Sequence, residues 1–190
     1  GTEYCLGVDT ALNVIRCAID SIRDTASSFS RAFVVEVMGR ECGYLALVSA
    51  LTSGAEMCLI PEIPYELDNY KTCFTKQMRN GREYFIAVVS ESLKNSEQVA
   101  QWFEDEIGVE SRITVLGHIQ RGGNPTVYDR LMAFNFITHA IDGLLEGKEC
   151  SVVCYSQGGF NHKKIDDVAF KEYQINKDML KLGSEFGSNR

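Results

Sequence analysis

The chain has 190 residues, of which 45% are hydrophobic and 24% are charged, a length and composition typical of a globular domain with a core of ordinary size. Its 19 basic and 26 acidic residues give a formal net charge of −7, which argues against nucleic acid or a membrane surface as the main partner. Any phosphate site must therefore be a local basic cluster.

The seven cysteines show no CxxC spacing and no pairing with the three histidines that is typical of metal ligands. We interpret them as free thiols in a reducing compartment and expect a cytoplasmic protein. No apolar stretch approaches the ~20 residues of a membrane span. The N-terminus also lacks the basic region followed by an apolar region that marks a secretory signal.

Helical and strand patterns alternate along the first half of the chain. Apolar residues at helical spacing predict a helix over residues 8–22, and a nearly continuous apolar run predicts a strand over residues 32–37. The same criteria predict a helix over 43–51, a short buried strand over 57–60 and, after two prolines, a helix over 68–78.

The second half continues the alternation, with a strand at 84–90, a helix at 96–107, a strand at 112–116, a helix at 128–145 and a strand at 151–155. Trp102 and Phe103 have the spacing of a core face, and we expect Tyr128, Phe134 and Phe136 to pack the long helix against its neighbours. The remaining residues, 157–190, form a more polar tail that we expect to end in a frayed segment.

This alternation predicts an α/β fold with three layers, in which a mainly parallel sheet is flanked by helices on both faces. Ligands of such sheets lie at the carboxyl ends of the strands. The loops at residues 38–43 and 117–125, and Glu91, each follow a predicted strand, so we expect them to converge on one site.

The most informative segment, residues 115–129, reads VLGHIQRGGNPTVYD. Its apolar start is typical of a buried strand, and Gly122 and Gly123 allow backbone angles that side chains forbid. His118 and Arg121, three residues apart, can direct donors at one anion. A lone His-x-x-Arg is more often a polar turn at a strand end, but the surrounding IQRGG-x-P pattern favours a binding site.

A second segment, residues 34–43, reads VVEVMGRECG and repeats this design: an apolar strand, a Gly-Arg loop and a helix that opens at Gly43. Loops of this kind offer backbone N–H groups and a guanidinium together, which suits a phosphate. With these two motifs in the expected order and spacing, nearly the whole chain resembles the phosphofructokinases. In that family VEVMGR and LGHIQRGG contact a sugar phosphate.

The resemblance implies specific roles for residues of the fructose 6-phosphate site. His118 and Arg121 are expected to bind the 6-phosphate, where each charge-assisted hydrogen bond contributes roughly 1.5–3 kcal/mol. Met38 and Gly39 are expected to contact the sugar, and Glu91 to accept hydrogen bonds from its hydroxyls. The remaining expectations are that Arg40 is catalytic, stabilising the transferring phosphoryl group, and that Arg31 and Arg112 reach the 6-phosphate bound to a neighbouring subunit.

In bacterial members a phosphate-bearing nucleotide effector binds between subunits, and Arg23, Gly54, Glu56 and Arg82 match positions used there. Two positions depart from that pattern. Asn80 replaces a basic residue, and Glu83 follows Arg82 where the family has two lysines. Because a carboxylate beside a phosphate is repulsive, these changes argue against control by ADP or phosphoenolpyruvate.

The family also carries a Gly-Gly-Asp-Gly-Ser loop for nucleotide phosphates and a Thr-Ile-Asp-Asn-Asp segment with the catalytic base, and neither occurs in this chain. We therefore interpret residues 1–190 as the sugar-phosphate-binding part of an incomplete phosphofructokinase-like domain, inactive alone. The function implied is glycolytic phosphoryl transfer from ATP to the 1-hydroxyl of fructose 6-phosphate. Mg²⁺ and ATP would be bound mainly outside these residues, no metal ligand is assigned within them, and the enzyme would be a homo-oligomer with shared active sites.

Two alternatives stay open from the residues alone. A pyrophosphate-dependent phosphofructokinase would share most of these motifs, although the uninterrupted QRGG resembles the ATP-dependent type more closely. A non-catalytic fructose 6-phosphate sensor would need only the residues present. Against the sensor, a sheet without its leading strands would expose an edge and apolar surface, which natural proteins avoid.

Overall fold

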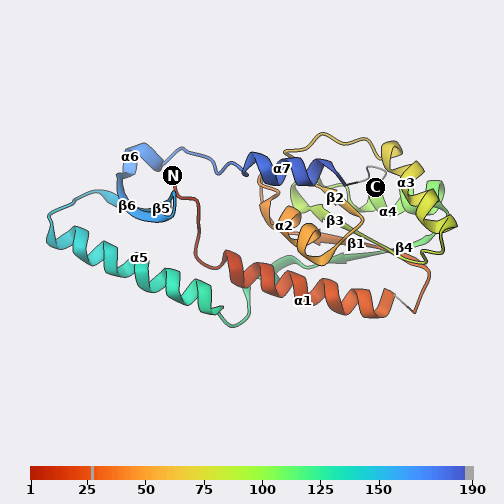
Figure 1. Cartoon of the computed structure of the whole chain (residues 1–190), viewed down its shortest axis with the longest axis horizontal. Coiled ribbons are helices and arrows are strands. Elements are labelled where there is room, and N and C mark those ends of the chain that lie inside the picture. The colour runs from red at the N-terminus through yellow and green to blue at the C-terminus, as the bar shows by residue number, and fades with distance from the viewer. Residues whose placement is uncertain (27, 187–190) are drawn as a thin grey trace. The chain divides into compact units, whose positions relative to one another are not determined.

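The computed structural model describes residues 1–26 and 28–186 (Figure 1). The chain divides into two compact units. One unit comprises residues 1–11 and 123–174, and the other comprises residues 12–122 and 175–190. The sequence patterns predict no boundary at these positions. The first boundary falls inside the predicted helix over residues 8–22, and the others fall in the predicted loop at 117–125 and in the polar tail.

A four-stranded parallel sheet forms the centre of the larger unit. Its strands lie in the order β2 (Met57–Leu59), β3 (Phe85–Ser90), β1 (Arg31–Val37) and β4 (Glu110–Val115). β1 pairs with both β3 and β4, and it places Val35 beside Val88 and Val34 beside Ile113. Because β1 and β3 are covered on both faces, their sequences are apolar at nearly every position.

Helices cover both faces of this sheet (Figure 1). One face carries residues 12–26 of α1 (Val8–Ala26), α2 (Tyr44–Ser53) and α7 (Lys177–Ser184), and the other carries α3 (Asp68–Arg79), α4 (Ser96–Trp102) and the π-helical turn η2 (Phe103–Ile107). The predicted three-layer arrangement with a parallel sheet is confirmed.

Side chains of β1 alternate between the two cores, as a strand requires. Val35 and Val37 join the core under α1 and α2, whereas Val34 joins the core under α3 and α4. The second core is rich in aromatic rings: Phe74 of α3 contacts Phe85, Trp102 and Phe103 with ring centroids 4.6–6.0 Å apart. The core role predicted for Trp102 and Phe103 is therefore confirmed.

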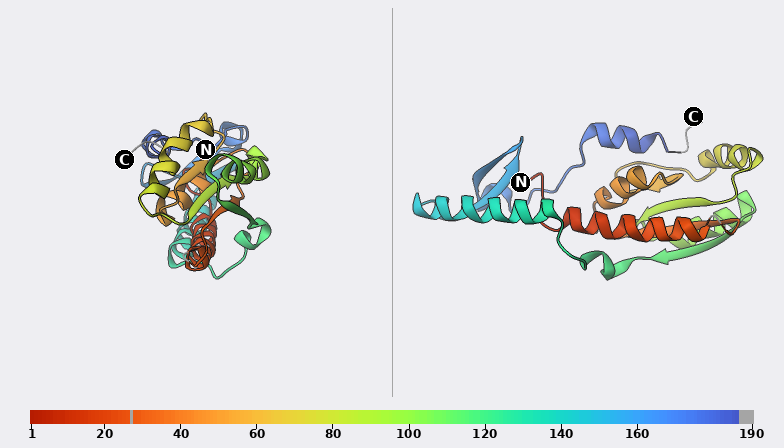
Figure 2. Two further views of the ribbon diagram at one scale, coloured as in Figure 1. Left: turned by 90° about the vertical axis from the view of Figure 1, so that its right-hand side faces the viewer. Right: turned by 60° about the horizontal axis from the view of Figure 1, so that its bottom comes forward.

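The smaller unit contains α5 (Val127–Leu145), the antiparallel pair β5 (Ser151–Ser156) and β6 (Gly159–Lys164), and the short helix α6 (Ile165–Val168). The hairpin packs beside α5, as Figure 2 shows. Its two-residue turn places Gln157 and Gly158 at φ 53° and 78°, the left-handed values that a tight hairpin turn needs. Among the described residues of this unit, Met132 and Cys154 are the buried hydrophobic side chains.

Two sequence expectations need correction. In addition, the polar tail, for which the sequence analysis predicted no element, contains β6, α6 and α7, because pairing with β5 and packing on α2 order segments whose own patterns are weak. The end of the tail, where a frayed segment is expected, lies outside the described residues. Phe134 is 69% exposed and does not pack the long helix as expected. Tyr128, although 44% exposed, contacts Tyr4 edge-to-face, and Phe136 contacts Phe160 in the same way. Gly122 has an ordinary φ of −87°, and the left-handed positions are Gly117 and Gly123.

All seven cysteines are free thiols, as predicted. Within the described part of the chain, no helix combines the length and apolar character needed to cross a membrane.

Candidate functional site

Three loops of the larger unit meet at the carboxyl edge of its sheet. Residues 38–40 follow β1, the 3-10 turn η1 (Glu91–Leu93) follows β3, and the 3-10 turn η3 (Gly117–Arg121) follows β4. Because β3, β1 and β4 are parallel neighbours, the three loops leave the sheet at the same edge. The predicted convergence is confirmed by hydrogen bonds that join the loops.

Glu91 holds the loop after β1. Its Oε1 accepts hydrogen bonds from the backbone N–H groups of Gly39, at 3.0 Å, and Arg40, at 2.9 Å. Arg40 has a φ of 50°, a left-handed conformation that is uncommon for a residue with a side chain and marks local strain. The carboxylate of Glu91 therefore stabilises a turn that presents the exposed guanidinium of Arg40 at the sheet edge.

The electrostatic environment keeps Glu91 ionised. Partial burial by itself would raise the pKa of Glu91, but the hydrogen bonds from Gly39 and Arg40 and the positive charges of Arg121 and His118 outweigh burial, so the pKa is lowered. The positive charges of η3 therefore act on the same carboxylate that accepts hydrogen bonds from the loop after β1.

His118 and Arg121 are exposed on η3, whereas Gln120 between them is 1% exposed. A 3-10 helix has three residues per turn, so residues i and i+3 share one side and the residue before i+3 points elsewhere. His118 and Arg121 are thus presented together at the sheet edge, in the arrangement that a single anion requires.

The buried Gln120 is a residue that the sequence analysis missed. Its Oε1 accepts a hydrogen bond from the N–H of Met38 at 3.1 Å, and its Nε2 donates one to the carbonyl of Gly117 at 3.0 Å. The glutamine of the IQRGG pattern was visible in the sequence, but nothing in the pattern distinguishes a buried glutamine from its exposed neighbours.

Arg31 and Arg112 lie away from this cluster. Arg31 begins β1, six residues before its end, which corresponds to about 20 Å along a strand. Both guanidinium groups pair with Glu110, at 2.6 Å in the case of Arg31, and hydrogen bonding from Arg31 lowers the pKa of Glu110. The structure therefore brings together Met38, Gly39, Arg40, Glu91, His118 and Arg121, but not Arg31 or Arg112.

A second cluster contains the four residues matched to the effector position. Arg23 donates from Nη2 to the carbonyls of Ser53, at 2.5 Å, and Gly54, at 3.2 Å. Arg82 forms an ion pair with Glu56, whose Oε2 also accepts the N–H of Ile86 at 2.7 Å. The four matched residues therefore lie around the first residues of β2 and β3.

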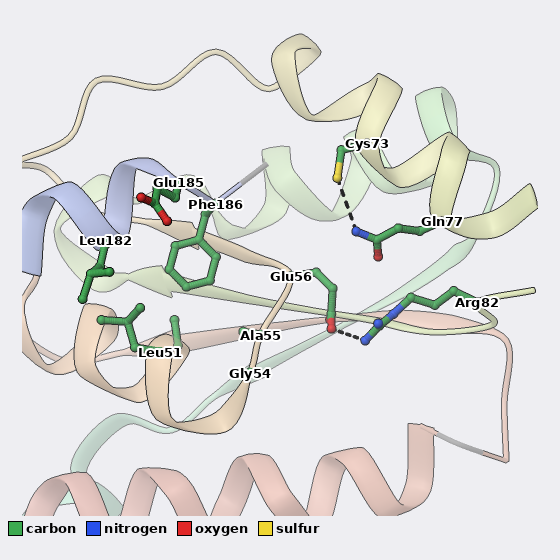
Figure 3. A pocket seen from close by; sticks show the side chains of 11 residues that line it. Leu51, Gly54, Ala55, Glu56, Cys73, Gln77, Arg82, Leu182, Glu185 and Phe186 are labelled. Atoms are coloured by element: carbon green, nitrogen blue, oxygen red, sulfur yellow. Dashed lines mark hydrogen bonds and ion pairs between the residues drawn. The ribbon is translucent and has the colours of Figure 1, made fainter. Parts of the chain in front are cut away.

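A cavity of about 390 Å³ adjoins this cluster, and Figure 3 shows its lining. Arg82 is the one basic residue among the lining residues that the structure describes, which also include Glu56 and Glu185. Burial raises the pKa of Glu56, although its hydrogen bond from Ile86 and the charge of Arg82 act in the opposite direction. The positive charge that a phosphate would need is thus already paired with a carboxylate.

Comparison with known proteins identifies the relatives of this chain. The profile of the family described as Phosphofructokinase matches residues 1–144. The protein named ATP-dependent 6-phosphofructokinase from Sulfurovum sp. (strain NBC37-1) is 72% identical over 188 residues, which make up 99% of this chain and 58% of that protein. A protein of the same name from Sulfurimonas denitrificans is 60% identical over 98% of this chain and 59% of its own length.

The solved structures agree in fold. Phosphofructokinase from Saccharomyces cerevisiae matches with a TM-score of 0.79 and 30% sequence identity, over 97% of this chain and 25% of that chain. The chain therefore spans a little under three fifths of the length of the two curated relatives.

Proposed function

Because this chain belongs to the phosphofructokinase family, we propose that it forms the fructose 6-phosphate-binding part of an ATP-dependent 6-phosphofructokinase. The observation that carries the proposal is the meeting of Arg40, Glu91, His118 and Arg121 at one sheet edge, linked by the hydrogen bonds of Glu91 and Gln120. We assign the whole of residues 1–190 to this sugar-phosphate-binding part.

The two basic side chains of η3 would bind the 6-phosphate. His118 and Arg121 are exposed, three residues apart and close enough to Glu91 to lower its pKa. Oε1 of Glu91 is engaged by two N–H groups, so its other oxygen would accept a hydrogen bond from a sugar hydroxyl. Met38 and Gly39 would form the floor of the sugar site.

Arg40 would act on the reacting group. Phosphoryl transfer to the 1-hydroxyl depends mainly on positioning and on stabilising the charge of the equatorial oxygens. A guanidinium presented by a turn that Glu91 holds can supply that stabilisation without reorganising. In this reaction ATP supplies the phosphoryl group and Mg²⁺ neutralises its charge. Within the described residues, no three His, Cys, Asp or Glu side chains gather as metal ligands would.

Arg31 and Arg112 suggest a shared site. Arg31 begins β1 and Arg112 lies near the beginning of β4, so both are at the opposite edge of the sheet from Arg121. They cannot serve the same bound phosphate as Arg121 within one subunit without spanning the sheet. We therefore propose a homo-oligomer in which these arginines reach the 6-phosphate of a neighbouring subunit, in the cytoplasm, where the seven free thiols would remain reduced.

We further propose that the cluster of Arg23, Gly54, Glu56 and Arg82 is a weak site for a nucleotide effector. The ion pair between Arg82 and Glu56 and the carboxylate of Glu185 in the adjoining cavity oppose a phosphate. We expect weak binding of ADP in the parent protein and tighter binding after Glu56→Gln, measured by calorimetry. Equal ADP affinity in both proteins would remove the cluster as an effector site.

The central test measures fructose 6-phosphate binding to the 190-residue chain by isothermal titration calorimetry. Arg121→Ala should weaken binding about tenfold or more, because it removes charge-assisted hydrogen bonds worth roughly 1.5–3 kcal/mol each. Arg16→Ala is the matched control, since Arg16 is a surface arginine of α1 that pairs with Asp20. A parent chain that binds fructose no more weakly than fructose 6-phosphate would contradict the proposal.

A further inference from the structure

The two loops that bracket the proposed sugar phosphate are joined by one buried carboxamide. The side chain of Gln120 accepts the N–H of Met38 through Oε1 and donates to the carbonyl of Gly117 through Nε2. An N–H group can only donate and a carbonyl can only accept, so these two partners fix which end of the carboxamide faces which loop. Gln120 is 1% exposed, so water cannot easily replace either bond.

The hydrogen bonds of Gln120 lie just beyond the end of the pairing between β1 and β4. The last pair of the ladder between β1 and β4 is Glu36 and Val115, and the N–H of Leu116 donates to the carbonyl of Glu36 at 3.1 Å. Beyond that point no ladder bond connects Met38 with Gly117 among the described residues. The carboxamide of Gln120 continues the connection by one further step, past the end of the strands.

The bridge sits behind the side chains that the proposed function uses. Gln120 is flanked on η3 by His118 and Arg121, which are exposed while it is buried. On the other loop it holds Met38, directly before the Gly39 and Arg40 N–H groups that Glu91 holds. Each loop therefore has one contact from Gln120 and at least one residue proposed to touch the ligand.

From this geometry we infer that Gln120 is a positioning residue, which sets the spacing between the sugar loop (residues 38–40) and the phosphate loop (residues 117–121). The inference rests on the proposed function. Gln120 does not contact the ligand, because its polar atoms are buried and engaged with backbone groups. Its effect is on ligands that must reach both loops at once.

Two ligands of different reach test this role. Inorganic phosphate needs only the phosphate loop, whereas fructose 6-phosphate needs both loops at the correct separation. Gln120→Met keeps the side-chain volume and removes both hydrogen bonds. We expect it to weaken binding of fructose 6-phosphate to the 190-residue chain roughly ten- to a hundredfold, as a small misplacement of binding groups does, and to change phosphate affinity less than about threefold.

A second variant separates the two bonds. Gln120→Glu keeps an oxygen that can accept the N–H of Met38, but its carboxylate cannot donate to the carbonyl of Gly117 and repels it. We expect the same preferential loss of fructose 6-phosphate binding. If Gln120→Glu fails to fold because it buries a charge, the neutral Gln120→Met, which keeps the side-chain volume, carries the same comparison of the two ligands.

Val99→Ala is the control for lost stability. Val99 is fully buried in the core under α3 and α4, and this change should lower the unfolding midpoint without altering either affinity. Equal fructose 6-phosphate affinity in the parent chain and both Gln120 variants, or equal losses for both ligands, would overturn the inference. A parent chain that does not bind fructose 6-phosphate would instead contradict the proposed function itself.

Discussion

At the scale of single residues, Glu91 couples the charge of the site to the shape of its loop. Its folded-state pKa is lowered from the ordinary value of 4.5. A depressed pKa contributes stability that is present above the unfolded-state value and is lost as the pH falls through the folded-state value. Glu91→Gln should therefore lower the free energy of unfolding at pH 7 and have little effect well below pH 4.5.

Urea unfolding at the two pH values measures this difference. Glu97→Gln, which removes an exposed carboxylate in the first turn of α4, controls for the loss of one negative charge. An equal effect of Glu91→Gln at both pH values would show that its hydrogen bonds and not its charge hold the Arg40 turn.

In the smaller unit, the carboxylate of Asp129 likewise stabilises a local structure through hydrogen bonds. It is 4% exposed and accepts hydrogen bonds from the hydroxyl of Tyr4 and from the N–H groups of Gly7 and Thr10, the latter two at 2.8 Å. Burial alone would raise the pKa of Asp129, but the hydrogen bonds from Thr10, Tyr4 and Gly7 lower it. One carboxylate thus ties the first ten residues to the start of α5.

Asp129→Asn should be strongly destabilising, because an amide group turns a donor towards groups that are themselves donors. We expect a loss of roughly 3 kcal/mol in the free energy of unfolding at pH 7, measured by urea denaturation. Asp142→Asn, on the same helix, is the control. A loss no larger than that of the control would mean that the hydrogen bonds of Asp129 add no net stability.

At the scale of elements, the packing of α5 on β6 depends on a missing side chain. A Cβ atom at Gly143 would lie 2.1, 2.7 and 2.9 Å from three ring atoms of His162, and His162 is also linked to the carbonyl of His139 at 3.0 Å. Gly143→Ala would improve helix propensity by about 1 kcal/mol, but the clash should cost about 1–3 kcal/mol.

We therefore expect Gly143→Ala to leave stability unchanged or lower it by up to about 2 kcal/mol, measured by thermal unfolding. Asn135→Ala, at a half-buried position of the same helix, should be neutral or slightly stabilising, because it raises helix propensity and loses one hydrogen bond from Nδ2 to the carbonyl of Leu131. If Gly143→Ala raised the unfolding temperature as much as Asn135→Ala, the contact between α5 and His162 would not be tight.

At the scale of the whole molecule, the smaller unit lacks a core of its own. Its long helix exposes Leu131 at 55%, Phe134 at 69% and Leu145 at 82%, and large apolar side chains exposed along one helix are typical of an interaction surface. A two-stranded hairpin on one helix buries too little apolar surface to be stable by itself. The chain of 190 residues should accordingly bind a hydrophobic dye.

Fluorescence of 8-anilinonaphthalene-1-sulfonate measures this property. The double change Leu131→Gln and Phe134→Gln should lower dye binding without lowering the helix signal in circular dichroism, because neither side chain is buried. Dye fluorescence in the parent chain as low as that of an ordinary folded monomer would contradict the exposure of this face.

The sequence by itself determined the α/β order of elements and the sheet edge where the loops meet, because hydrophobic periodicity and glycine-marked loops are local signals. Arg40, Glu91, His118 and Arg121 each follow a predicted strand, but their roles were expected only because VEVMGR and LGHIQRGG resemble the phosphofructokinase motifs. Only the tertiary structure decided that Gln120 is buried and bridges two loops, that Arg31 and Arg112 pair with Glu110, and that Phe134 has no core to enter. The burial of a side chain and its hydrogen-bond or ion-pair partners depend on residues that are distant in the chain, so a local sequence pattern cannot predict them. The same reason explains why β6 and α7 escaped prediction: their order comes from pairing with β5 and packing on α2, not from their own sequences.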